Sequence, residues 1–196
     1  MILLTAVATG TLAGWGFAKW RGVAWQPPFF KATWLVALGF IPQFTAFYFP
    51  YTRRLLTDDL ASLSLVCSQV MLLFFAILNR RMPGMPVFIL GLGCNLAVIL
   101  ANGGFMPLTV DAASRLVNQA VLDSLIIGER ISSASKDILL PETRILLPWL
   151  ADRFVPPQNM PYRFAFSVGD VFVAAGAFWM LVGGRPALSL LNSGDN

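Results

Sequence analysis

Apolar residues dominate five stretches of this chain, and polar residues separate them. The apolar stretches are 2–18, 33–49, 60–78, 86–101 and 164–182. A helix of about 17 to 25 mainly apolar residues is long enough to cross the hydrocarbon core of a bilayer. The pattern therefore predicts an all-α membrane protein with a bundle of about five transmembrane helices.

A long polar connection, 108–163, separates the fourth apolar stretch from the fifth. It holds six basic and six acidic residues, so its formal charge is zero. Thr109 can cap a helix over 110–127, which has apolar residues on one face and ends at a glycine. We therefore expect four transmembrane helices in 1–107, an extracytoplasmic loop with an amphipathic helix in 108–163, and a fifth helix with a short tail in 164–196.

The composition agrees with a membrane setting. Hydrophobic residues make up 57% of the chain and charged residues 12%, whereas an average soluble domain has roughly 25% charged residues. The first apolar stretch differs from a signal peptide because no positive residue precedes it, while Lys19 and Arg21 follow it. We expect it to be a transmembrane helix.

The charges beside the apolar stretches predict an orientation. With the amino terminus outside, the short inner loops and the tail hold six basic residues and the short outer loop holds two. The inner ones are Lys19, Arg21, Lys31, Arg80, Arg81 and Arg185, and the outer ones are Arg53 and Arg54. The positive-inside rule then favours an amino terminus outside and a carboxyl terminus in the cytoplasm.

Asp170 is the most unusual residue, because it lies about one third of the way along the last apolar stretch. A charged Asp at the centre of a bilayer helix costs roughly 2.5 to 3.5 kcal/mol, so such acids usually face the bundle interior or a wet cavity. Ser167, three residues earlier, suits the start of a helix whose capping box has Asp in place of Glu. Asp170 is therefore a structural cap or a working acid.

Other polar residues near the apolar stretches are candidates for the same site. Asn95 lies within the fourth stretch, and Asn102, Gly103 and Gly104 follow it. The last three suit a helix stop, and the alternative is an exposed nest of backbone amides.

No metal, cofactor or nucleic-acid partner is expected. The chain has no His, and Cys67 and Cys94 lie inside predicted spans without a CxxC motif. No stretch interleaves basic and aromatic residues as a nucleic-acid surface does.

Three short motifs resemble one family. They are ANGGFMP at 101–107, PETR at 141–144 and FSVGD at 166–170. Together they resemble an uncharacterised family of bacterial integral membrane proteins, the domain-of-unknown-function family 5317. The resemblance adds Glu142 and Arg144 to the candidate residues. It implies a multi-pass protein of the bacterial inner membrane, and it implies no activity.

The last apolar stretch also resembles signal peptidase II more weakly. The run FSVGDVFVAAG at 166–176 is similar to the last helix of that family and places Asp170 where a catalytic Asp would fall. The family's second Asp comes three residues after an Asn, whereas here Val98 comes three residues after Asn95. An aspartic dyad needs two close carboxylates, so this mechanism requires Asp111 or another loop acid to fold back.

Three functions are compatible with these features. The leading hypothesis is a non-enzymatic multi-pass membrane protein, structural or partner-binding, whose outer loop meets another membrane protein. The first alternative is an intramembrane aspartate-dependent peptidase or lipid-processing enzyme. The second is a small transporter, for which Asp170 and a helix broken at Pro42 and Gln43 are the evidence.

Overall fold

The computed structural model describes residues 2–157, 163–183 and 185–186, and the chain is mostly helical. The α-helices are α1 (Ile2–Trp20), α2 (Trp34–Gln43), α3 (Thr52–Leu55), α4 (Asp58–Leu78), α5 (Met85–Ala101), α6 (Val110–Leu116), α7 (Gln119–Ser124) and α8 (Val168–Val182). A π-helix η1 (Phe44–Tyr48) and two 3₁₀ turns, η2 (Glu142–Arg144) and η3 (Pro148–Leu150), join them. The strands are β1 (Trp25–Gln26), β2 (Met106–Thr109), β3 (Asp137–Leu140) and β4 (Arg185–Pro186).

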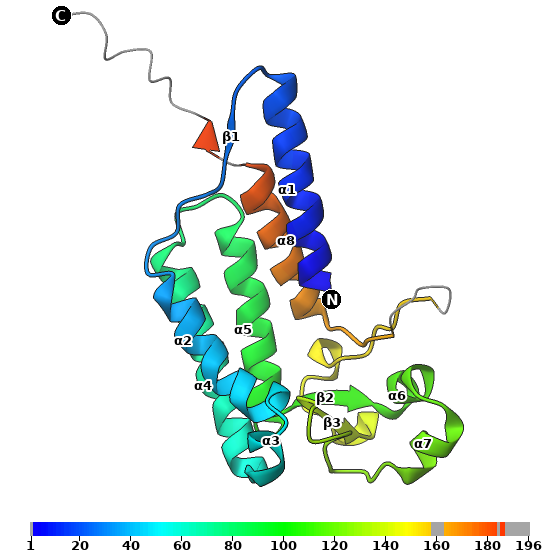
Figure 1. The fold of residues 1–196 in the computed structure, drawn as a ribbon. Coiled ribbons are helices and arrows are strands. Elements are labelled where there is room, and N and C mark those ends of the chain that lie inside the picture. The colour runs from blue at the N-terminus through cyan, green and yellow to red at the C-terminus, as the bar shows by residue number, and fades with distance from the viewer. Residues whose placement is uncertain (1, 158–162, 184, 187–196) are drawn as a thin grey trace, which may run out of the picture.

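The long helices form an open array and not a closed bundle. Along the array α1 packs on α8, α8 on α5, α5 on α4, and α4 on α2 (Figure 1). The segment 102–157 folds into a separate lobe at one end of this array. We call the two parts the array and the lobe.

Two described helices, α1 and α4, are long and apolar enough to cross a membrane by length and composition. They have 19 and 21 residues, and their mean hydropathies are 1.2 and 2.2. The helical segment Trp34–Tyr48, α5 and α8 are shorter apolar helices. The expectation of a mainly helical chain is therefore confirmed, whereas five membrane spans stay a prediction.

The second predicted helix, 33–49, changes character near its middle. It is α-helical as α2, which contains Pro42 and ends at Gln43, and then widens into the π-helix η1 from Phe44. Proline has no backbone N–H and clashes with the preceding turn, so the regular hydrogen-bond pattern cannot continue through it. The neighbouring Gln43 accepts a hydrogen bond from Ser68 Oγ at 3.1 Å, which ties α2 to α4.

The sequence-based expectation of one helix over 110–127 is wrong. The structure has two short helices, α6 and α7, separated by two extended residues, Val117 and Asn118. Asn118 Oδ1 accepts a hydrogen bond from Val121 N at 2.9 Å, so it caps a new helix and does not continue the old one. Most of the predicted range is helical, but the capping residue Asn118 divides it into two helices.

The loop also contains strand pairing that the sequence analysis missed. β2 and β3 pair in parallel, with Met106 opposite Asp137 and Thr109 opposite Leu140. Beside this ladder Leu108, Ala112, Ala113 and Leu139 form a small core of the lobe. A second core joins lobe to array, with Phe105 and Met106 packed against residues of α4 and α5.

Glycines allow α5 and α8 to touch backbone to backbone. A Cβ atom placed on Gly91 would lie 2.5 Å from Val173 N and 2.6 Å from Gly169 O, and one placed on Gly176 would lie 2.6 Å from Phe88 N. Small residues at helix interfaces give close approach and large van der Waals contact. The seam between α5 and α8 therefore depends on these positions having no side chain.

We predict that Gly91→Ala destabilises the protein by about 1 to 3 kcal/mol, because its methyl group would overlap the backbone of α8. Gly93→Ala on the same helix is the matched control, since a Cβ there meets nothing within 4 Å. Unfolding titrations in detergent would measure the free energy of unfolding of both variants and of the wild type. Equal stability of the two variants would contradict the proposed packing.

Candidate functional site

Asn95, Ser167 and Asp170 meet at the seam between α5 and α8. We call these three residues the polar latch. Asn95 Nδ2 donates to Asp170 Oδ1 at 2.9 Å, and Ser167 Oγ donates to Asn95 Oδ1 at 3.0 Å. A Cβ atom on Gly169 would collide with Asn95 Oδ1, so this glycine makes room for the amide.

Ser167 and Asp170 also form a capping box at the start of α8. Asp170 N donates to Ser167 Oγ at 3.1 Å, and Ser167 N donates to Asp170 Oδ2 at 3.1 Å. Hydropathy alone predicts a helix that begins at 164. The capping box explains why the helix begins at Val168 instead. Both carboxylate oxygens of Asp170 thus accept hydrogen bonds from the chain itself.

Backbone pairing brings the lobe to the same place. Asp152 N donates to Pro107 O at 3.0 Å, which fixes Asp152 beside β2. Two residues later, Phe154 and Phe166 exchange backbone hydrogen bonds of 3.1 and 2.9 Å. Phe166 immediately precedes the latch residue Ser167, so the lobe and the start of α8 are joined by backbone contacts.

A charged cluster lies next to the latch. Lys136 Nζ lies 2.9 Å from Asp152 Oδ2 and 3.1 Å from Asp137 Oδ1. The side chain of Asp152 is only 2% exposed, and its Oδ1 has no hydrogen-bond partner among the described residues. We call Lys136, Asp137, Asp152 and Asp170 the acidic cluster, because two carboxylates contact the ammonium group of Lys136 and the charge of Asp170 acts on it as well.

The electrostatics of the cluster follow from burial and charge. Burial raises the pKa of the Asp152 carboxyl to about 7; Lys136 opposes this rise, and the negative charges of Asp137 and Asp170 add to it. For Lys136, burial alone would lower the pKa, but the charges of Asp137, Asp152 and Asp170 outweigh it and hold the pKa above its usual value. Asp170 therefore acts electrostatically on both groups.

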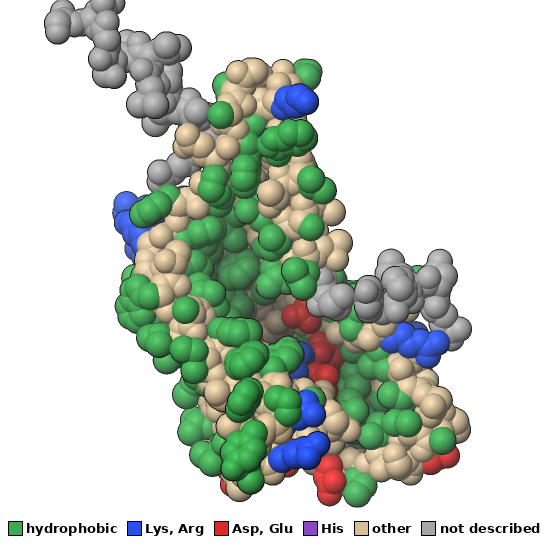
Figure 2. Space-filling model, viewed as in Figure 1, with side chains coloured by type: hydrophobic (Ala, Val, Ile, Leu, Met, Phe, Trp, Pro, Cys, Tyr) green, Lys and Arg blue, Asp and Glu red, His purple; other side chains and the backbone are tan. Residues whose placement is uncertain are grey.

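A hollow lined by hydrophobic side chains opens along the array. Figure 2 shows acidic and basic side chains at the lower end of this hollow, where the array meets the lobe. Within the described residues, no group of three or more His, Cys, Asp or Glu side chains could hold a metal ion.

A comparison with protein-family models matches residues 29–182 to a family of unknown function, DUF5317. The chain belongs to this family. The matched range contains α2, α4, α5, the lobe and α8, and therefore the whole latch and the acidic cluster. No curated protein and no solved structure matches the chain.

The other predicted residues take different places. Asn102 lies at the end of α5 and holds the lobe through Leu146, whose N donates to Asn102 Oδ1 and whose O accepts from Asn102 Nδ2, both at 2.9 Å. Gly103 and Gly104 follow with φ of +78° and +86°, and Gly104 N closes the helix end on Ile99 O at 2.8 Å. These contacts make the segment a helix stop.

Glu142 and Arg144 lie on the lobe, outside the latch. Glu142 Oε1 is 3.3 Å from Arg153 Nη2, in an ion pair whose side chains are 62% and 40% exposed. Arg144 is exposed and forms no ion pair with a described residue. Asp111, the loop acid named as a possible second carboxylate, pairs with Arg115 at 2.8 Å and is 70% exposed.

Sequence reasoning missed Lys136, Asp137 and Asp152. All three lie in the long polar connection, where twelve charged residues have no spacing that distinguishes these three. The β2–β3 register and the Phe154–Phe166 pairing set the positions of these residues. Both pairings join residues that are separated along the chain.

We predict that the lobe becomes less stable as pH rises from about 5 to about 8. The pKa of Asp152 is higher in the folded protein than its ordinary value of 3.8, so its contribution is complete below about 3.8 and is lost as pH rises through about 7. Asp152→Asn should reduce this pH dependence. Hydrogen exchange of the β2 and Asp152 amides, measured at both pH values and normalised for intrinsic exchange, would test it.

Asp111→Asn is the control for this prediction, because it removes an exposed carboxylate of the same lobe. It should leave the pH dependence as in the wild type. Unchanged pH dependence in Asp152→Asn would contradict the assigned role of Asp152.

Proposed function

We propose that the chain is a non-enzymatic, multi-pass protein of the bacterial inner membrane that binds another membrane protein through its lobe. α1 and α4 are long and apolar enough to cross a membrane, and the shorter apolar segments pack beside them in one array. In this proposal five helical segments span the bilayer. The amino terminus and the lobe lie outside, and the carboxyl terminus lies in the cytoplasm.

The non-enzymatic part of the proposal rests on the hydrogen bonds of the Asp170 carboxylate. Its two oxygens accept hydrogen bonds from Asn95 Nδ2 and Ser167 N, at 2.9 and 3.1 Å. A general acid or base must lie within hydrogen-bond reach of a substrate proton, whereas both oxygens of Asp170 are oriented by donors of the chain itself. A carboxylate whose two oxygens are bonded by its own helix start and by the neighbouring helix is suited to holding the seam together.

The surface of the lobe supports the partner-binding part. Several large apolar side chains of the lobe are exposed, namely Ile126 (59%), Ile127 (53%), Leu146 (60%), Trp149 (59%) and Phe154 (43%). Exposed apolar groups beside polar ones are common where a protein meets a partner, and Trp is enriched at the centres of such contacts. Trp149 is therefore the residue we would expect at the interface.

Site-specific photo-crosslinking in living cells tests the partner. A photoreactive phenylalanine analogue at Trp149 should give one discrete product with a second membrane protein, identified by mass spectrometry. The matched control is the same analogue at Trp20, an exposed Trp at the far end of α1. Only lipid adducts at position 149, or the same protein partner at both positions, would contradict the proposal.

A second function, a peptidase or lipid-processing enzyme, is favoured by one observation. In this alternative Asp152 of the lobe takes the place of the acid that α5 lacks, because the negative charge of Asp170 adds to the rise in the pKa of Asp152. The hydrophobic hollow that ends at charged side chains would suit an amphiphilic substrate (Figure 2). Against it, Asp152 is almost completely buried and paired with Lys136.

Incubation of the purified protein with a diacylated lipopeptide separates the two functions. Our proposal expects no cleavage by the wild type. Cleavage that is lost in both Asp170→Asn and Asp152→Asn, with melting temperatures unchanged, would establish the enzyme instead. Asp111→Asn serves as the control for a general effect of charge removal.

A further inference from the structure

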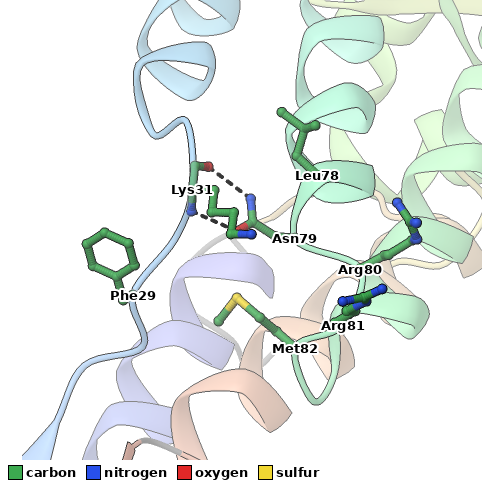
Figure 3. Close-up of a pocket in the computed structure, with 7 residues that line it drawn as sticks. All are labelled: Phe29, Lys31, Leu78, Asn79, Arg80, Arg81 and Met82. Carbon is green, nitrogen blue, oxygen red and sulfur yellow. Dashed lines mark hydrogen bonds between the residues drawn. The ribbon is translucent and has the colours of Figure 1, made fainter.

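A cavity of about 350 Å³ lies where the segment before α2 meets the end of α4. Phe29 and Lys31 come from the first of these, and Leu78, Asn79, Arg80, Arg81 and Met82 come from the end of α4 and the turn after it (Figure 3). None of these residues belongs to the latch or the acidic cluster. The cavity is thus a separate feature of the array.

Three of the seven described lining residues are cations, and none of the seven is an acid. Lys31, Arg80 and Arg81 are exposed and form no ion pair with any described residue. Arg80 only reaches the carbonyl of Ile77, at 3.5 Å. Three unpaired cations around one cavity repel each other, and an anion would relieve this repulsion.

A buried asparagine holds the two walls together. Asn79 is 4% exposed; its Oδ1 accepts from Lys31 N at 2.8 Å, and its Nδ2 donates to Lys31 O at 3.0 Å and to Phe75 O at 2.9 Å (Figure 3). These bonds fix the backbone of Lys31 against the end of α4. The fold therefore fixes the backbone positions from which these cationic side chains extend.

The rest of the cavity is apolar. Phe29, Leu78 and Met82 line it together with the cations. α2 and α5 both begin within three residues of lining residues, at Trp34 and Met85, and the first turn of a helix favours negative charge. Cationic and apolar walls on one cavity match a ligand that carries both an anionic group and a hydrocarbon part.

We propose that this cavity binds a phosphate-bearing anion, and that its apolar wall selects the headgroup of an anionic phospholipid over free phosphate. Arg and Lys are the side chains that bind phosphate groups, Arg through two parallel N–H donors. Basic pockets at the ends of membrane helices bind anionic headgroups in the same way. The inference concerns the end of the array away from the lobe and does not depend on a lobe partner.

Lipid retention by the purified protein in detergent tests the proposal. Native mass spectrometry would compare phosphatidylglycerol with phosphatidylcholine, each added at equal amount. We expect selective retention of phosphatidylglycerol by the wild type, and a loss of at least about fivefold in Arg80→Gln/Arg81→Gln. Retention of phosphatidylcholine should be the same in both proteins.

The matched control is Arg53→Gln/Arg54→Gln, another adjacent Arg pair, located on α3 at the opposite end of α4. It should retain phosphatidylglycerol like the wild type. An equal loss in this control, or no loss in Arg80→Gln/Arg81→Gln, would overturn the site. Melting temperatures in neutral detergent show whether each variant is folded.

Inorganic phosphate distinguishes the two sources of the anion. If the cavity selects a lipid headgroup, millimolar inorganic phosphate should leave phosphatidylglycerol bound. Binding of inorganic phosphate that requires Arg80 and Arg81, without selective retention of phosphatidylglycerol, would overturn the lipid assignment and identify a soluble phosphate ligand. A failed crosslink at Trp149 would leave these results unaffected.

Discussion

The backbone contact between α5 and α8 is the constraint on which the rest of the structure depends. Gly91 and Gly169 let the two helices touch, and the space above Gly169 is filled by the Asn95 amide. The amide then reaches both Ser167 and Asp170. Close packing and polar satisfaction are thus parts of one arrangement, because a side chain on Gly169 would displace the group that completes the latch.

The lobe depends on the same seam. At its start the lobe follows α5 through Asn102 and the two glycines. At its end it is joined to the start of α8 through the Phe154–Phe166 pair and Ser167. Asn102 also bonds the backbone of Leu146, which adds a third attachment. The lobe is therefore fastened at both ends of the segment.

Local patterns in the sequence predicted the parts of the fold that depend on local physics. The apolar stretches locate the helices of the array, and the Ser167–Asp170 spacing indicates the start of α8. The loop was harder. The amphipathic period over 110–127 does not reveal that Asn118 caps a second helix, and the β2–β3 ladder joins residues about thirty positions apart. The place of Asp152 follows from such distant pairings, so no spacing near Asp152 could indicate it.

A double-mutant cycle on Asn95 and Asp170 tests the central claim most directly. The unfolding free energies of Asn95→Ala, Asp170→Ala and the double variant would be measured by denaturing-detergent titration in mixed micelles. The latch predicts a coupling energy of about 0.5 to 2 kcal/mol, because the second substitution removes a group that has already lost its partner. Effects that add within about 0.3 kcal/mol would contradict it, since Asp170 would then not hold the seam through Asn95.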